Sequence, residues 1–321
     1  MIISRAPLRI TLGGGGTDLP FYYKEGGGFL LSAAINRYMY IVLHDRSIED
    51  TIKLKYSKTE TVVSTNQIEH KFFKHILKKY GIEKSIEITS IADVGAGTGL
   101  GSSGAFTVAL LNAIHKYKGI QKTRKEFAEE ACEIEMELSS AGKQDTYIAV
   151  YGGIRQFTVD EKGEVDVKNA FISEETIDKL EKNILLFFTG YSRSADQILE
   201  QQKNNPEKLR EYYDSSYSRG RVASIALVDG DMQAFADTLN AHWKQKKKFA
   251  ENTQFDSIYK AGISAGALGG KLQGAGGGGF FMFYCEEPNQ KRLREKMAEL
   301  GLKEMTWRLD LDGAKLFQVG E

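Results

Sequence analysis

The chain has 321 residues, 41% of them hydrophobic, and its 43 basic residues balance 43 acidic ones. This length and composition predict a globular protein of one large or two ordinary domains, and the balanced charge argues against general attraction to nucleic acid or an anionic membrane. With only two cysteines, no signal-peptide pattern and no apolar run near the ~20 residues that span a bilayer, we expect a protein of the reducing cytoplasm.

The first segment is predicted to be a strand that ends in a glycine turn. Residues 2–12 are mostly aliphatic, and four glycines at 13–16 follow them. Arg9 and Asp18 flank these glycines and would place opposite charges at the mouth of the turn. A flexible hairpin loop is the alternative interpretation of four consecutive glycines.

Short apolar segments at regular intervals then predict a sheet with one helix. The strands are expected at 29–45, as one or two strands, and at 51–56, 61–64 and 85–91. The helix is expected over 68–80, where apolar residues recur at helical spacing and Gly81 follows as a C-cap.

A second glycine cluster follows the last of these strands and opens into a helix. In residues 94–104 a glycine stands at every second position from Gly95 to Gly101, and an apolar stripe begins after Ser103. Glycine lets the backbone approach a ligand closely, and the free N–H groups at a helix N-terminus attract anions. Strand, glycine loop and helix in this order predict a phosphate site.

The next helix carries a candidate metal ligand. Thr123 and Glu126 form a capping-box pattern, and at about 100° per residue Glu135 lies only about 60° from the centre of the apolar stripe. A carboxylate that points inward needs a cation or hydrogen-bond donors, although an ordinary glutamate at the edge of the stripe is the alternative.

Asp145 stands at the start of a short predicted helix over 145–151. The carboxylate there suits a catalytic role, but aspartate is also a preferred N-cap residue, so a purely structural role stays open.

The second half of the chain is predicted to be an α+β unit reached through a polar passage at 171–182, after a hairpin at 154–167. Its strands are expected at 183–190, 280–285, 305–311 and 315–319, and its helices at 194–203, 206–228, 231–249, 254–265 and 289–300. This order predicts a split-βαβ sheet, and the segment 271–279, with its run of glycines, predicts a turn packed closely against another surface.

Together these motifs resemble the GHMP superfamily of small-molecule kinases. Residues 6–18 are similar to the first motif of that family, 97–103 to the second and 272–279 to the third. The resemblance implies a two-domain α+β fold: an N-terminal domain like ribosomal protein S5 domain 2 at 1–172, and a ferredoxin-like C-terminal domain at 173–321. Within the superfamily, residues 142–145 and 189–193 most resemble the heptose 7-phosphate kinases.

That resemblance implies transfer of the ATP γ-phosphate to the anomeric hydroxyl of D-glycero-D-manno-heptose 7-phosphate. The product would be the 1,7-bisphosphate used for nucleotide-activated heptose and surface polysaccharide. Asp145 matches the residue that accepts or orients the sugar hydroxyl, and Arg9 a cation that steadies the phosphoryl group or the aspartate. Ser103 and Glu135 match the Mg²⁺ ligands, a hydroxyl and a carboxylate suited to a hard cation.

The remaining implied roles are binding roles. ATP is expected to contact the second motif, at Gly97, Gly99, Leu100, Gly101, Ser102, Ser103 and Gly104. The sugar phosphate is expected to contact Gly15, Gly16, Thr17, Asp18, Ser192, Arg193, Gly276 and Gly277. Arg193 is the candidate for the distal phosphate, because a guanidinium binds phosphate through two hydrogen bonds.

Three other functions compete with this one. They are a 1-kinase for another sugar of the galactose or fucose type, a sugar and ATP sensor without catalysis, and a dinucleotide oxidoreductase. Against the last, residues 118–123 hold no Asp or Glu where a ribose-binding acid would stand. We expect no nucleic acid or membrane partner, and the sequence leaves a homodimer open.

Overall fold

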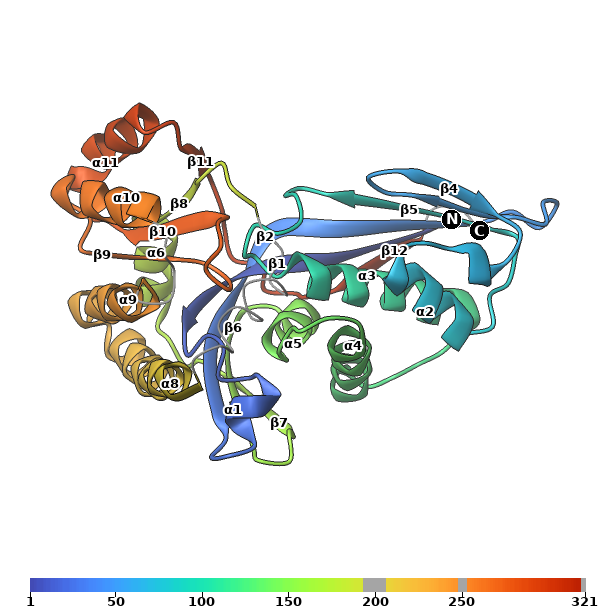
Figure 1. The fold of residues 1–321 in the computed structure, drawn as a ribbon, viewed down its shortest axis with the longest axis horizontal. Helices are drawn as coiled ribbons and strands as arrows, with labels where there is room; N and C mark the ends of the chain where they lie inside the picture. Colours follow the sequence, from blue (N-terminus) through green and yellow to red (C-terminus); the bar gives the residue numbers. More distant parts are fainter. Residues whose placement is uncertain (193–205, 248–252, 319–321) are drawn as a thin grey trace.

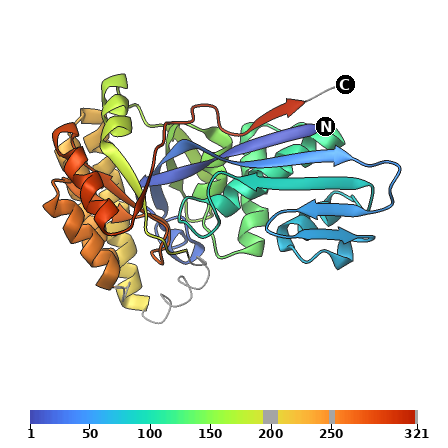
Figure 2. The same cartoon turned by 90° about the horizontal axis from the view of Figure 1, so that it is seen from above.

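The computed structural model describes residues 1–192, 206–247 and 253–318, and it contains two sheets flanked by helices. The larger sheet is formed mainly by the first half of the chain and the smaller by the second (Figure 1). Seen from above, the long strands of the larger sheet extend away from the helices that surround the smaller one (Figure 2).

Eight strands form the larger sheet. They are β1 (Ile2–Gly13), β2 (Gly28–Asp45), β3 (Ile52–Lys55), β4 (Thr59–Val62), β5 (Ile86–Ala92), β6 (Ile154–Val159), β7 (Val165–Asn169) and β12 (Lys315–Gln318). The main order is β12-β1-β2-β5-β3-β4, and β6 pairs with β2 and β7. The long strand β2 organises the sheet: its first half pairs with β6, its second half with β5, and its other edge with β1.

Helices pack on one face of this sheet. They are α2 (Lys71–Lys79), α3 (Ser102–Lys118), α4 (Arg124–Leu138) and α5 (Gln144–Tyr151), while the short α1 (Pro20–Tyr23) and a 3₁₀ turn (Thr65–Gln67) lie in connections. Helix α3 packs against both β1 and β2, and α4 and α5 pack against α3. Because α3 is enclosed in this way, its residues from Gly104 to Leu111 are all buried. The capping box at Thr123 is confirmed.

The smaller sheet has four strands in the order β11-β8-β10-β9, with every pair antiparallel. The elements of this part are α6 (Glu174–Asn183), β8 (Ile184–Phe188), α8 (Pro206–Asp229), α9 (Met232–Lys246), α10 (Thr253–Ser264), β9 (Gly269–Leu272), β10 (Phe280–Tyr284), α11 (Glu287–Glu299) and β11 (Lys303–Met305). In chain order the strands lie 4-1-3-2, which confirms the predicted split-βαβ sheet.

Both faces of the smaller sheet are buried. Alternate residues of a strand point to opposite sides of the sheet, and in β8 the residues on each side join a hydrophobic core. Ile184 and Leu186 of β8 join the hydrophobic core that continues from the larger sheet. Leu185 and Phe187 join a second core with Trp243 of α9. The two halves therefore share one continuous core, which holds the cavity between them in place.

The second half differs from the expectations in four places. The polar passage at 171–182 contains a helix, α6, whose N-terminus is capped by Ser173, and the turn expected over 271–279 starts later, because residues 269–272 form a strand, β9. Of the strand expected at 305–311, only Met305 belongs to a strand, as the last residue of β11. The last strand, β12, does not complete the smaller sheet but pairs with β1 of the larger one.

The predicted two-domain α+β fold is confirmed by the two sheets. The boundary between residues 172 and 173 stays a prediction. Strand β12 lies after this boundary but pairs with the larger sheet.

Cys132 and Cys285 are both free and buried, and burial raises the pKa of Cys132 to about 12 and that of Cys285 to about 11. In the described parts of the chain, no helix is long and apolar enough to cross a membrane. The helix expected at 194–203 lies outside the described residues.

Candidate active site

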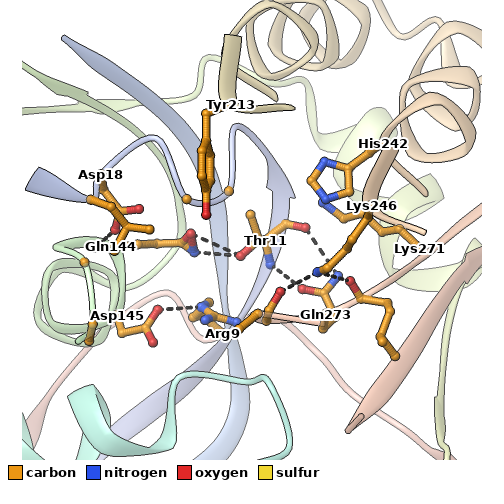
Figure 3. A pocket seen from close by; sticks show the side chains of 18 of the residues that line it. Arg9, Thr11, Asp18, Gln144, Asp145, Tyr213, His242, Lys246, Lys271 and Gln273 are labelled. Carbon is orange, nitrogen blue, oxygen red and sulfur yellow. Dashed lines mark hydrogen bonds and ion pairs between the residues drawn. The ribbon is translucent and has the colours of Figure 1, made fainter. Parts of the chain in front are cut away.

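A cavity of about 150 Å³ opens between the two halves of the molecule. The larger sheet and its helices contribute Arg9, Asp18, Ser103 and Asp145 to its lining, and Lys246 comes from α9 on the opposite side. Figure 3 shows the side chains of Arg9, Asp18, Asp145 and Lys246 converging from elements far apart in the sequence.

Arg9 and Asp145 form an ion pair at the base of this cavity. The guanidinium Nε of Arg9 donates to Oδ1 of Asp145 at 2.7 Å, and its Nη1 donates to the Gly99 carbonyl at 2.6 Å. The Arg9 side chain is 8% exposed and that of Asp145 18%. The pair therefore fixes the Asp145 carboxylate while leaving it accessible to a ligand.

Asp145 lies in the first turn of α5, whose N-cap residue is Lys143. The alternative that Asp145 merely caps this helix is therefore wrong. Its neighbours explain two glycines of the second motif: a Cβ on Gly104 would lie 2.6 Å from the Asp145 Cβ, and one on Gly101 3.0 Å from its Cγ. Both distances are too short for a side chain, so these glycines allow Asp145 to pack against the start of α3.

Ser103 and Glu135 form a second polar pair beside the first. The Ser103 hydroxyl donates to Oε1 of Glu135 at 2.6 Å. Glu135 is fully buried, as its position on the helix predicted, and its Oε2 has no hydrogen-bond partner among the described residues. Burial, together with the charge of Asp145, raises the pKa of Glu135 to about 8.

The two glycine loops of the second and third motifs pack against each other. Gly99 has a φ of +77°, and a Cβ on it would lie 2.7 Å from the Gln273 carbonyl oxygen. A Cβ on Gly279 would lie 2.0 Å from the carbonyl oxygen of Thr98, which accepts the Phe280 N–H at 3.2 Å. The close packing predicted for residues 274–279 is thus confirmed, and it joins the two halves at the site.

The glycine turn after β1 places Asp18 on another wall of the cavity. Oδ2 of Asp18 accepts the backbone N–H of Gln144 at 2.8 Å, and burial raises the pKa of Asp18. A Cβ on Gly142 would lie 2.2 Å from Oδ2 of Asp18, so only glycine fits there. Unlike Asp18, Thr17 does not line the cavity, and its hydroxyl shares its hydrogen between the carbonyls of Gly14 and Phe29, each at 2.8 Å.

The structure therefore brings together six of the expected residues in the cavity lining, which are Arg9, Gly15, Gly16, Asp18, Ser103 and Asp145. Glu135 lies behind Ser103. Thr17, Gly276 and Gly277 are buried outside the lining, Ser192 is exposed, and Arg193 lies outside the described residues.

A set of polar residues that the sequence analysis missed completes the cavity. Thr11 donates its N–H to Gln273 at 2.9 Å and accepts from the Gln144 side chain at 2.6 Å, which ties both halves to β1. Lys246, Lys271 and His242 line the side formed by the smaller sheet. Of these three residues, only Lys271 stands out in the sequence, because it is a single charged residue between glycines and Leu272.

The Ser103 and Glu135 pair fits a magnesium ion. An unpartnered, buried carboxylate oxygen next to a hydroxyl is a donor set for a hard cation, and Mg²⁺ in phosphotransferases usually takes only one or two protein ligands beside water and substrate phosphates. Among the described residues, no group of three or more His, Cys, Asp or Glu suited to a metal occurs.

The fold and the site define a kinase of the GHMP family. Residues 66–153 match the model of the GHMP kinases N-terminal domain, and residues 223–302 match that of the GHMP kinases C-terminal domain. The chain belongs to this family and is an ATP-dependent kinase.

Its relatives include kinases of sugars and of mevalonate. The D-glycero-alpha-D-manno-heptose 7-phosphate kinase of Campylobacter jejuni is 30% identical over 308 residues, covering 90% of this chain and 91% of the relative. The mevalonate kinase of Methanothermobacter thermautotrophicus is 28% identical, covering 65% of this chain and 67% of the relative. A solved structure of a D-glycero-D-manno-heptose 1-phosphate kinase from Bacteriodes thetaiotaomicron is similar over 100% of both chains, with a TM-score of 0.83 and 27% identity.

Proposed function

We propose that this ATP-dependent sugar kinase phosphorylates the anomeric hydroxyl of D-glycero-D-manno-heptose 7-phosphate and forms the 1,7-bisphosphate. The kinase of Campylobacter jejuni named above supports this substrate, and so does the resemblance of residues 142–145 and 189–193 to the heptose 7-phosphate kinases. The names of the two heptose kinases place the substrate phosphate at different carbons, 7 and 1, so the position of transfer is the first point to test.

The observation that carries the proposal is the Arg9 and Asp145 pair. The 2.7 Å bond occupies one carboxylate oxygen of Asp145 and leaves the other for the sugar hydroxyl. A carboxylate in this position orients the hydroxyl and accepts its proton during attack, a contribution worth about 10²–10⁴-fold in general. The guanidinium of Arg9 lies next to the hydroxyl, where its positive charge stabilises the negative charge of the transferring phosphoryl group.

The nucleotide is proposed to bind along the second motif. Gly97, Gly99 and Gly101 all have positive φ values, a backbone conformation that is open to glycine without strain. Helix α3 starts directly after them, so its first N–H groups and its dipole face the ATP phosphates. Ser103 and Glu135 would hold Mg²⁺, which neutralises charge on the phosphates when it is bound.

The sugar is proposed to occupy the cavity between this loop and the smaller sheet. Asp18 faces the cavity, and its oxygens can accept hydrogen bonds from sugar hydroxyls. Gly15 and Gly16 add backbone to the same wall. Arg193 stays our candidate for a guanidinium that binds the distal phosphate, and Ser192, Gly276 and Gly277 stay candidates for contacts with the sugar phosphate. Buried reduced thiols and the use of ATP favour the cytoplasm as the place of action.

Phosphorus NMR of the products tests the proposal. The purified protein is incubated with ATP and, separately, heptose 7-phosphate, heptose 1-phosphate, heptose, galactose and fucose. We expect turnover of heptose 7-phosphate with a new signal coupled to the anomeric proton. A preference for galactose or fucose would establish the alternative 1-kinase, and ADP release with none of the sugars would support a sensor without catalysis.

A further inference from the structure

Two lysines from the second half of the chain lie buried at the cavity. Lys246 comes from the last turn of α9 and is 5% exposed, and Lys271 comes from β9 and is 2% exposed. Lysine is rarely buried so deeply without a counter-charge, because removing an ammonium group from water is costly.

Neither lysine forms an ion pair with a residue that the structure describes. The Nζ of Lys246 donates to the carbonyls of Leu272, at 3.1 Å, and Gly274. The Nζ of Lys271 donates to the Leu12 carbonyl at 3.4 Å. Carbonyl oxygens satisfy some of their hydrogen bonds but do not neutralise their charges.

The acids of the site are already engaged elsewhere. Asp145 is paired with Arg9, Asp18 accepts the N–H of Gln144, and Glu135 accepts from Ser103. In the part of the chain that the structure describes, none of these carboxylates forms an ion pair with either ammonium group.

The electrostatics of the lysines reflect this shortage of negative charge. Burial and the nearby Arg9 lower the pKa of Lys246 to about 7, and burial and Lys246 lower that of Lys271. Burial and the charge of Lys271 lower the pKa of His242 too. This side of the cavity is suited to an anion.

The position of Lys246 relative to the reacting groups suggests which anion binds. Figure 3 shows Asp145 and Lys246 on opposite sides of Arg9. A sugar whose reacting hydroxyl lies at Asp145 can thus extend an anionic group at its other end towards Lys246. A phosphate meets this need because it carries about two negative charges and several acceptor oxygens, and lysine is a common phosphate ligand.

We propose that Lys246, with Lys271 beside it, binds the phosphate that the sugar substrate already carries and makes the enzyme selective for a phosphorylated sugar. The inference rests on the proposed function, since it concerns the same acceptor. In this proposal, Lys246 of α9 selects the substrate, whereas the reacting groups, Arg9 and Asp145, come from β1 and α5.

The test compares the kinetics of two variants on two substrates. Lys246→Met removes the charge at similar length, and Lys244→Met is the matched control, because Lys244 is exposed on the same helix. For heptose 7-phosphate we expect the KM of Lys246→Met to rise at least tenfold. For unphosphorylated heptose and for ATP we expect KM within a factor of two of wild type. Lys244→Met should behave as wild type on all three.

Inorganic phosphate gives a second readout that does not depend on a folded variant. In the wild-type protein it should inhibit competitively against heptose 7-phosphate but not against unphosphorylated heptose. Absence of this competition would overturn the proposal, and so would a Lys246→Met variant that discriminates between the two sugars like wild type. A raised KM for ATP alone would assign Lys246 to the nucleotide and overturn it as well.

A wrong proposed function would give a different experimental result from a wrong assignment of Lys246. If the wild-type enzyme turns over an unphosphorylated sugar better than any sugar phosphate, the proposed substrate is wrong before any variant is measured. If wild type prefers the sugar phosphate and Lys246→Met keeps that preference, only the assignment of Lys246 is wrong.

Discussion

Replacing Glu135 by glutamine removes a titrating group from the interior of the site at nearly constant volume. The side chain is fully buried and its Oε1 accepts from Ser103 at 2.6 Å, a bond that the amide oxygen of glutamine can keep. In the wild-type protein, burial and Asp145 raise the pKa of Glu135 from 4.5 to about 8. Between pH 4.5 and pH 8, the folded chain thus retains a proton that the unfolded chain releases.

The sign of the pH dependence follows from this difference. Because the folded state binds more protons between pH 4.5 and 8, the wild-type free energy of unfolding falls as pH rises through this interval. At about 1.4 kcal/mol per pKa unit, the loss between pH 5 and pH 8 amounts to about 3 kcal/mol. Glutamine does not titrate in this range. As the pH rises from 5 to 8, the free energy of unfolding of Glu135→Gln should therefore increase by about 3 kcal/mol relative to that of wild type.

Thermal unfolding of both proteins, measured without nucleotide at several pH values, provides the assay. At roughly 2 °C per kcal/mol for a large chain, the Tm difference should change by about 6 °C in favour of the variant between pH 5 and pH 8. Glu133→Gln, at an exposed position of the same helix, should show no such change. Parallel Tm curves for wild type and Glu135→Gln would refute the reasoning. The variant should also lose activity, because a neutral amide is a weaker ligand for Mg²⁺ than a carboxylate.

Three further substitutions test other parts of the site. Asp145→Asn should lower kcat by about 10²–10⁴-fold without weakening ATP binding in a nucleotide titration, and a near-normal kcat would contradict its role. Gly99→Ala places a Cβ 2.7 Å from the Gln273 carbonyl oxygen at a φ of +77°, so both Tm and ATP affinity should fall, and an unchanged Tm would contradict the packing described for the two loops. Arg193→Ala should chiefly raise the KM for the sugar phosphate at constant kcat, and an unchanged KM would remove this residue from the binding site.

Local patterns predicted the elements around the glycine loop at 94–104 well. Glycines at alternate positions, a strand before them and an apolar helix after them are sufficient to predict the loop, because each depends on residues close in sequence. The inward direction of Glu135 was equally predictable, since helical periodicity alone decides which side chains face the core.

The same patterns failed where a long-range partner decides the outcome. The local sequence leaves a capping role for Asp145 open, and only the structure shows that Lys143 is the N-cap residue and that Asp145 pairs with Arg9, 136 residues earlier. Asp18 lines the cavity, whereas the adjacent Thr17 turns away from it towards Phe29, whose carbonyl accepts the Thr17 hydroxyl. Neighbouring residues in one turn thus have different surroundings that no local pattern describes.

By itself, the sequence determined the order of most elements, with α6 and β9 as exceptions, and the acidic, hydroxyl and glycine residues suited to phosphate chemistry. Only the tertiary structure decided that β12 returns to β1 and that Lys246 and Lys271 face Arg9 across one cavity. The physical reason is that periodicity specifies which face of a strand or helix is buried, but not which edge or surface covers it. The partner is selected by the packing of the whole chain, and in this protein that packing completes the site.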